Sequence, residues 1–109
     1  MQAINKDTFE QYRQVFGTTK MMSLWQEFKE STENKLKNIE NSSLEEIRLC
    51  FHSLRSSSLV FGLDELSKNC EAIEEAVLSG EKLAEIKKYI DKTKKLFYNA
   101  CESINELFK

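Results

Sequence analysis

The chain contains no proline, and only three of its 109 residues are glycine. Because proline is the strongest interrupter of a helix, helix ends must here be marked by glycine and by turn-prone polar residues. Gly17, Gly62 and Gly80 each stand where one helical pattern stops and another starts, and the run "ENSS" at 40–43 marks a fourth junction. These positions predict long helices joined by short turns.

Long apolar runs and an excess of positive charge are also missing. No uninterrupted apolar stretch approaches the roughly 18 residues of a membrane span, and the N-terminal "MQAINKDTF" lacks the basic flank and apolar run of a signal peptide. The net charge is −2, with lysines and glutamates interleaved, so the basic stripe typical of nucleic-acid binding is missing. We therefore expect a cytoplasmic protein with no membrane and no nucleic-acid partner, and its charged outer faces favour a monomer.

The chain has three cysteines and one histidine, which are too few and too widely spaced for a metal site or a disulfide framework. Cys50, Cys70 and Cys101 form no CxxC pair, and each falls on an apolar stripe of a predicted helix. We therefore expect three buried free thiols, no metal-ligating residue and no cofactor held by this chain.

Apolar residues recur at steps of three and four along the chain, and no segment alternates apolar and polar residues with period two. This pattern predicts an all-α fold without strands, in which a single domain spans residues 1–109. Four long amphipathic helices joined by short turns imply an antiparallel up-down-up-down four-helix bundle. A short extra N-terminal helix would pack on one end of it.

The predicted helices are marked by capping residues and by apolar inner faces. The short first helix has Asp7 as N-cap and Glu10 three residues later, a capping-box spacing. The third helix begins after Ser42 or Ser43, each followed by a glutamate three residues later, and runs to Phe61. The inner faces are Met21, Trp25, Phe28, Thr32, Leu36 and Ile39 in the second helix (about 18–39), Leu63, Leu66, Cys70, Ile73 and Val77 in the fourth, and Leu83, Ile86, Ile90, Phe97, Cys101, Ile104 and Phe108 in the fifth.

The only histidine, His52, lies in the middle of the third predicted helix. At about 100° per residue it points roughly 140° away from the centre of the apolar arc of that helix, so we expect it in water rather than in the core. Its neighbours on that side include Arg48, Arg55 and Ser56, and the last two lean back toward it. The apolar arc consists of Leu44, Ile47, Cys50, Phe51, Leu54 and Phe61.

Two apolar residues, Leu49 and Leu59, flank the exposed side of the same helix. Such residues suit a partner-docking surface, and arginine side chains are suited to holding phosphate oxygens. An exposed histidine without a role is the ordinary alternative. The residues alone leave both interpretations open.

The spacing around His52 resembles the signature of the histidine-containing phosphotransfer (HPt) domain. That signature reads His-x-hydrophobic-Lys-Gly, then small residues, with a second glycine ten positions after the histidine. Leu54 and Gly62 match it, "SSS" fills the small-residue stretch, and "LDELSKNCEAIEEAV" is similar to the next helix of the family, with its Leu-x-x-x-Cys-x-x-hydrophobic-Glu pattern. The chain departs from the signature twice: Arg55 replaces the usual lysine and keeps its charge, and Ser56 replaces the usual glycine, one turn from His52.

The resemblance implies a phosphoryl carrier rather than an enzyme. His52 would accept a phosphoryl group from the aspartyl phosphate of one receiver domain and pass it to another, in a two-component phosphorelay from a hybrid histidine kinase to a response regulator. The receiver would supply the Mg²⁺ that such a transfer needs. The implied site residues are Arg55, Ser56 and Arg48 at the phosphate and Leu49 and Leu59 at the docked partner.

Two alternatives stand beside this interpretation. "FHSLRSSS" is also similar to the His-Glu-Leu-Arg-Thr-Pro box of histidine-kinase dimerisation helices, which Arg55 fits better. That box, however, has an acidic residue and a proline where this chain has Ser53 and Ser57, and the chain has no glycine-rich phosphate loop. The second alternative is a phosphorylation-incompetent HPt-like bundle that serves as a protein-interaction adaptor, with His52 incidental.

Overall fold

The computed structural model describes residues 4–109 as a bundle of α-helices, with one 3-10 turn and no strand in that range. The all-helical bundle predicted from the sequence is confirmed. Residues 1–3, part of the predicted domain and of the segment "MQAINKDTF", lie outside the described residues. Among the helices of residues 4–109, none combines the length and the apolar character of a membrane span. The elements are α1 (Lys6–Phe16), α2 (Thr18–Leu36), η1 (Ile39–Asn41), α3 (Leu44–Val60), α4 (Asp64–Leu78) and α5 (Leu83–Leu107).

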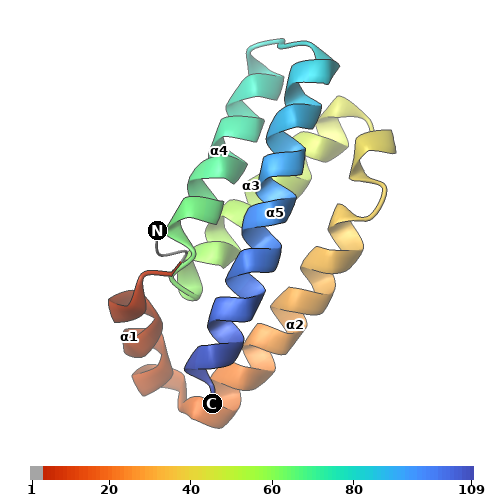
Figure 1. The fold of residues 1–109 in the computed structure, drawn as a ribbon. Helices are drawn as coiled ribbons and strands as arrows, with labels where there is room; N and C mark the ends of the chain where they lie inside the picture. The colour runs from red at the N-terminus through yellow and green to blue at the C-terminus, as the bar shows by residue number, and fades with distance from the viewer. Residues whose placement is uncertain (1–3) are drawn as a thin grey trace.

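The four longer helices, α2 to α5, run along the length of the molecule, and α1 packs at one end (Figure 1). The closest packing is between α3 and α4. Two small buried side chains allow this approach: Ser58 on α3 is fully buried, and Ser67 on α4 is 6% exposed. The Ser67 hydroxyl also donates a hydrogen bond to the main-chain oxygen of Arg55 (2.9 Å). This contact holds α4 beside the part of α3 that carries His52.

A capping box starts α3. The Ser43 hydroxyl accepts a hydrogen bond from the main-chain N–H of Glu46 (3.1 Å), and the Glu46 carboxylate accepts one from the main-chain N–H of Ser43 (3.0 Å). Two otherwise unpaired N–H groups at the helix start are thereby satisfied. Of the two starts that the sequence allowed, the structure selects the one after Ser43.

The first helix begins earlier than predicted. Its N-cap is Asn5, whose side-chain oxygen accepts a hydrogen bond from the main-chain N–H of Thr8 (3.2 Å), whereas the predicted cap, Asp7, lies in the first turn. Asn5 is held in place from outside the helix, because its main-chain N–H donates to the main-chain oxygen of Gly62 (2.6 Å). Gly62 has a φ of +73°, and a Cβ there would lie 2.3 Å from the Asn5 oxygen, so only glycine fits this contact.

The second helix ends at Leu36, three residues before the predicted end. Lys37 adopts an extended backbone conformation and ends α2, and Asn38, which is left-handed with φ 58°, turns the chain into η1. Ile39 is nevertheless buried as expected, at 5% exposure, because η1 turns it back toward the bundle.

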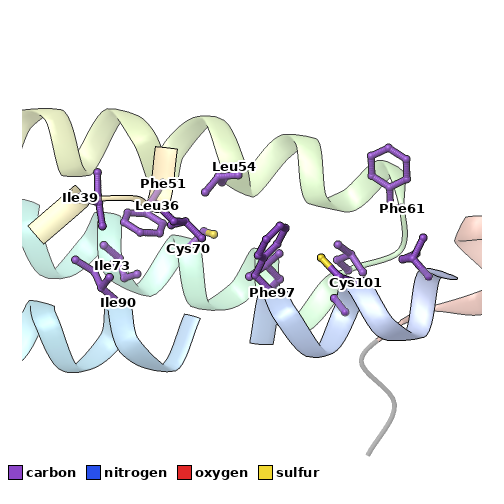
Figure 2. Close-up of a cluster of buried hydrophobic side chains, with 14 of the residues drawn as sticks. Leu36, Ile39, Phe51, Leu54, Phe61, Cys70, Ile73, Ile90, Phe97 and Cys101 are labelled. Carbon is purple, nitrogen blue, oxygen red and sulfur yellow. The ribbon is translucent and has the colours of Figure 1, made fainter. Parts of the chain in front are cut away.

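Side chains from every long helix meet in one core (Figure 2). The predicted apolar stripes form this core, with two exceptions. Leu44 and Leu83 are 44% and 42% exposed, because each is the first residue of its helix and lies at the edge of the bundle. The stripe residues that are only partly buried are Phe28, Cys50, Val77 and Phe108.

The three cysteines are free thiols inside or beside the core. Cys70 and Cys101 are buried and Cys50 is half-buried, and burial raises the pKa of Cys70 to about 12 and that of Cys101 to about 11. A thiol with so high a pKa stays protonated at neutral pH and reacts poorly. Within residues 4–109, no group of three or more histidine, cysteine or acidic side chains is placed to hold a metal ion.

Candidate functional site

His52 lies on the outer face of α3, where its side chain is 53% exposed. The residues one position before and two after it, Phe51 and Leu54, are 0% and 2% exposed. The helix thus presents the imidazole to solvent and its apolar arc to the core, and the predicted orientation of α3 agrees with the structure.

A carboxylate from the neighbouring helix holds one nitrogen of the ring. Nδ1 of His52 lies 2.6 Å from Oε2 of Glu74 on α4, and the Glu74 side chain is only 12% exposed. An ionised carboxylate can only accept a hydrogen bond, so an ionised Glu74 requires the imidazole tautomer with its proton on Nδ1. In that neutral tautomer the free lone pair lies on Nε2, the other ring nitrogen.

Arg55 approaches the other oxygen of the same carboxylate. Its Nη1 lies 3.7 Å from Oε1 of Glu74 and 4.0 Å from Oε2 of Glu71, which is also on α4. His52, Glu74 and Arg55 therefore form a continuous polar row across the α3–α4 interface. A cation beside the carboxylate partly offsets the cost of holding Glu74 in a nearly buried position.

Arg48, the second arginine near the histidine, pairs within its own helix. Its guanidinium donates two hydrogen bonds to Glu45, at 2.5 and 3.1 Å, and these bonds raise the pKa of Arg48 and lower that of Glu45. Ser56 is exposed on the same side of α3 as His52. The contact of Arg48, Arg55 and Ser56 with a phosphate stays a prediction.

The two leucines expected beside the histidine are exposed on α3. Leu49 is 51% exposed and Leu59 is 46% exposed, in contrast to the buried Leu54 on the opposite face of the helix. They lie on opposite sides of His52 along the helix. Their role in docking a partner stays a prediction.

Glu74 is the site residue that sequence reasoning missed. It lies 22 residues after His52, so no helical spacing within α3 relates the two. A signal was present in "LDELSKNCEAIEEAV", because Glu74 is the glutamate that ends the Leu-x-x-x-Cys-x-x-hydrophobic-Glu pattern. Only the packing of α4 against α3 gives that glutamate its partner.

A family model described as the Hpt domain matches residues 23–96, more than half of the chain. The chain belongs to the Hpt domain family. Members of the Hpt family carry phosphoryl groups on histidine in phosphorelays, and the matched range contains the whole polar row of His52, Arg55 and Glu74. The Hpt match leaves out α1, the first turn of α2 and the last turns of α5. Neither a curated protein nor a solved structure gave a match.

Proposed function

We propose that the protein is a histidine phosphotransfer protein, which accepts a phosphoryl group on His52 from the aspartyl phosphate of a receiver domain and passes it to a second receiver. The observation that carries this proposal is the exposed imidazole whose Nδ1 is held by Glu74 at 2.6 Å. The donor would be the receiver of a hybrid histidine kinase, the acceptor that of a cytoplasmic response regulator. The bundle would have the antiparallel up-down-up-down topology, formed by α2 to α5 with α1 added.

The chemistry follows from the position of the ring proton. The Nε2 lone pair of His52 attacks the phosphorus in line, the N–P bond forms, and the bond between phosphorus and the aspartyl oxygen breaks, which leaves the receiver carboxylate. The proton on Nδ1 remains in its hydrogen bond to Glu74, so no proton has to be lost from the nucleophilic nitrogen. The return step is the reverse reaction with the aspartate of the second receiver.

The charge on the phosphoryl oxygens must be balanced by cations from both partners. Arg55 is the nearest such group on this chain, and its contacts with Glu74 and Glu71, at 3.7 and 4.0 Å, are long enough for the guanidinium to turn toward a phosphate. Arg48 would first have to leave Glu45, and Ser56 would offer one hydroxyl. Mg²⁺ would be held by the receiver domain, which makes this protein a carrier and half of an active site.

Leu49 and Leu59 would give the receiver an apolar contact surface on either side of the histidine. Each is about half exposed, so docking would remove apolar surface from water without opening the core. Two such contacts fit a small, transient interface, which a carrier needs because it must release each partner.

The test is phosphorylation of the purified protein by a receiver domain charged with acetyl phosphate. In His52→Gln the label on this protein is expected to disappear, while the free energy of unfolding stays within about 0.5 kcal/mol because the position is exposed and the amide still offers Glu74 a donor. Ser53→Gln, which introduces the same residue at the next exposed position, should keep the label.

Label that persists on His52→Gln would move the phosphorylation site elsewhere and contradict the proposal. A receiver that binds the wild-type protein without transferring a phosphoryl group would favour the adaptor function instead. The serine at position 56, where the family signature has glycine, is the feature that keeps this second function open.

A further inference from the structure

The polar row at the α3–α4 interface includes a second carboxylate that the transfer chemistry does not use. Glu71 lies on α4 one turn before Glu74, and its Oε2 is 4.0 Å from Nη1 of Arg55. The same Nη1 is 3.7 Å from Oε1 of Glu74, so the guanidinium is shared between the two carboxylates. Within residues 4–109, the ion pair with Arg55 is the only one that Glu71 makes.

The row carries more negative than positive charge even before a phosphoryl group arrives. When the imidazole is neutral, the carboxylates of Glu71 and Glu74 are opposed by the single guanidinium of Arg55. A phosphoryl group on the ring would add about two further negative charges. Arg48, the other arginine near the ring, is engaged by Glu45 through two hydrogen bonds at 2.5 and 3.1 Å. The phosphoryl oxygens would therefore compete with two carboxylates for Arg55.

The two carboxylates differ in what else they contact. The Glu74 side chain is 12% exposed and lies 2.6 Å from Nδ1 of His52, so its position is tied to the orientation of the ring. The Glu71 side chain is 51% exposed and contacts only the guanidinium of Arg55. Residues three apart on a helix have their Cβ atoms about 5–6 Å from each other, so the Glu71 charge lies within about one Debye length of the ring at physiological ionic strength.

We propose that Glu71 is a positioning residue that competes with the phosphoryl group for Arg55 and thereby lowers the stability of phosphorylated His52. This role rests on the proposed phosphotransfer function. In the outgoing step the N–P bond at Nε2 breaks, a bond forms between phosphorus and a carboxylate oxygen of the receiver, and the electron pair of the N–P bond returns to Nε2. Glu71 makes no bond in this step. By holding Arg55 toward α4, it shifts the equilibrium from the histidine toward the receiver aspartate.

The experiment measures the equilibrium constant of phosphoryl transfer between the full chain and a receiver domain that has been charged with acetyl phosphate and then freed of it. The distribution of label between the two proteins gives the constant. Glu71→Gln should raise the phosphorylated fraction of His52, with a change in the constant of about threefold, the size expected for a partly exposed ion pair. The difference from the wild-type protein should vanish at about 1 M salt, where the Debye length is about 3 Å. A change in packing alone would not show this salt dependence.

The matched control is Glu75→Gln, which removes the same charge at an exposed position one turn after Glu71, and it should leave the constant unchanged. In an Arg55→Gln background, Glu71→Gln should change the constant by less than about 1.5-fold, because the group that it competes for is gone. The proposal is overturned if Glu71→Gln leaves the constant unchanged, or if its full effect persists without Arg55. In both cases the wild-type protein still takes up label, so the phosphotransfer function would stand. A wild-type protein that takes up no label would overturn that function and the role of Glu71 together.

Discussion

At the scale of single residues, the contact between His52 and Glu74 would decide, under the proposed phosphotransfer, which ring nitrogen reacts. The carboxylate is nearly buried and the ring is half exposed, so the fixed member of the pair is Glu74 and the imidazole orients to it. A glutamine in place of Glu74 has both a donor and an acceptor, and can bind either tautomer of the ring. The preference for a proton on Nδ1 would then be lost.

We therefore expect Glu74→Gln to slow phosphorylation of His52 by about tenfold, since a hydrogen bond to a charged group is worth about 1.5–3 kcal/mol and 1.4 kcal/mol corresponds to a factor of ten. Stopped-flow or quench-flow transfer from a charged receiver measures the rate, and nitrogen NMR of the imidazole reports the tautomer. Glu75→Gln, the same change at the next and exposed residue, is the control. An unchanged rate together with an unchanged tautomer would show that Glu74 does not orient the ring.

At the scale of elements, α3 has one face that is buried in the core and one face that is exposed to solvent. The inner face packs Ile47, Phe51 and Leu54 into the core, and the outer face carries His52 between two exposed leucines. Under the proposed function, the same substitution on each face would therefore separate stability from partner binding.

Leu54→Asp should destabilise the protein by about 3 kcal/mol or more, because a carboxylate would be forced into a site that is 2% exposed. Leu59→Asp should change the free energy of unfolding by less than about 0.5 kcal/mol and should weaken receiver binding. Urea unfolding and a binding titration measure the two effects. Equal destabilisation by both substitutions would contradict the orientation of α3.

The turn η1 is tied to α5 by an ion pair. Nζ of Lys94 lies 2.5 Å from Oε1 of Glu40, and both side chains are about a quarter exposed. The hydrogen bond from Lys94 holds the pKa of Glu40 below its usual value of 4.5. A carboxyl group whose pKa is lowered on folding adds stability above its unfolded pKa, and this stability is lost as the pH falls through the folded pKa.

Lys94→Met should accordingly lower the free energy of unfolding by about 0.5–1 kcal/mol at pH 7. The difference from the wild-type protein should shrink as the pH falls below the usual 4.5 and through the lowered pKa of Glu40 in the wild-type protein, because the ion pair is lost once Glu40 is protonated. Urea unfolding across this pH range measures the difference in free energy of unfolding. The control is Lys95→Met, the same change at the neighbouring exposed residue. A difference that is the same at pH 7 and pH 3 would mean that the lysine stem, and not the ion pair, supplies the stability.

At the scale of the whole molecule, the spacing of apolar residues along the chain predicted those features that depend on interactions within a single helix. The helices, the inner stripes and the outward position of His52 depend on which residues recur every three to four positions, so they could be inferred from the sequence. The choice of Asn5 over Asp7 as N-cap depends on a contact with Gly62, and the pairing of Glu74 with His52 depends on how α4 packs against α3. Contacts between segments that are distant in the sequence do not produce a periodic pattern of residues. They can therefore be identified only in the folded structure.

His52 stands eight residues from either end of α3. The free main-chain N–H groups of a helix, which bind phosphate in many proteins, belong to its first turn, and around His52 they are already engaged by carbonyl groups one turn earlier. No free backbone N–H groups would therefore be available to bind a phosphoryl group on Nε2. Within α3, only side chains such as Arg55 could approach it. Under the proposed function, such a site would hold the phosphoryl group without stabilising it strongly. The N–P bond would keep most of its free energy of hydrolysis, so the group would remain available to the next aspartate.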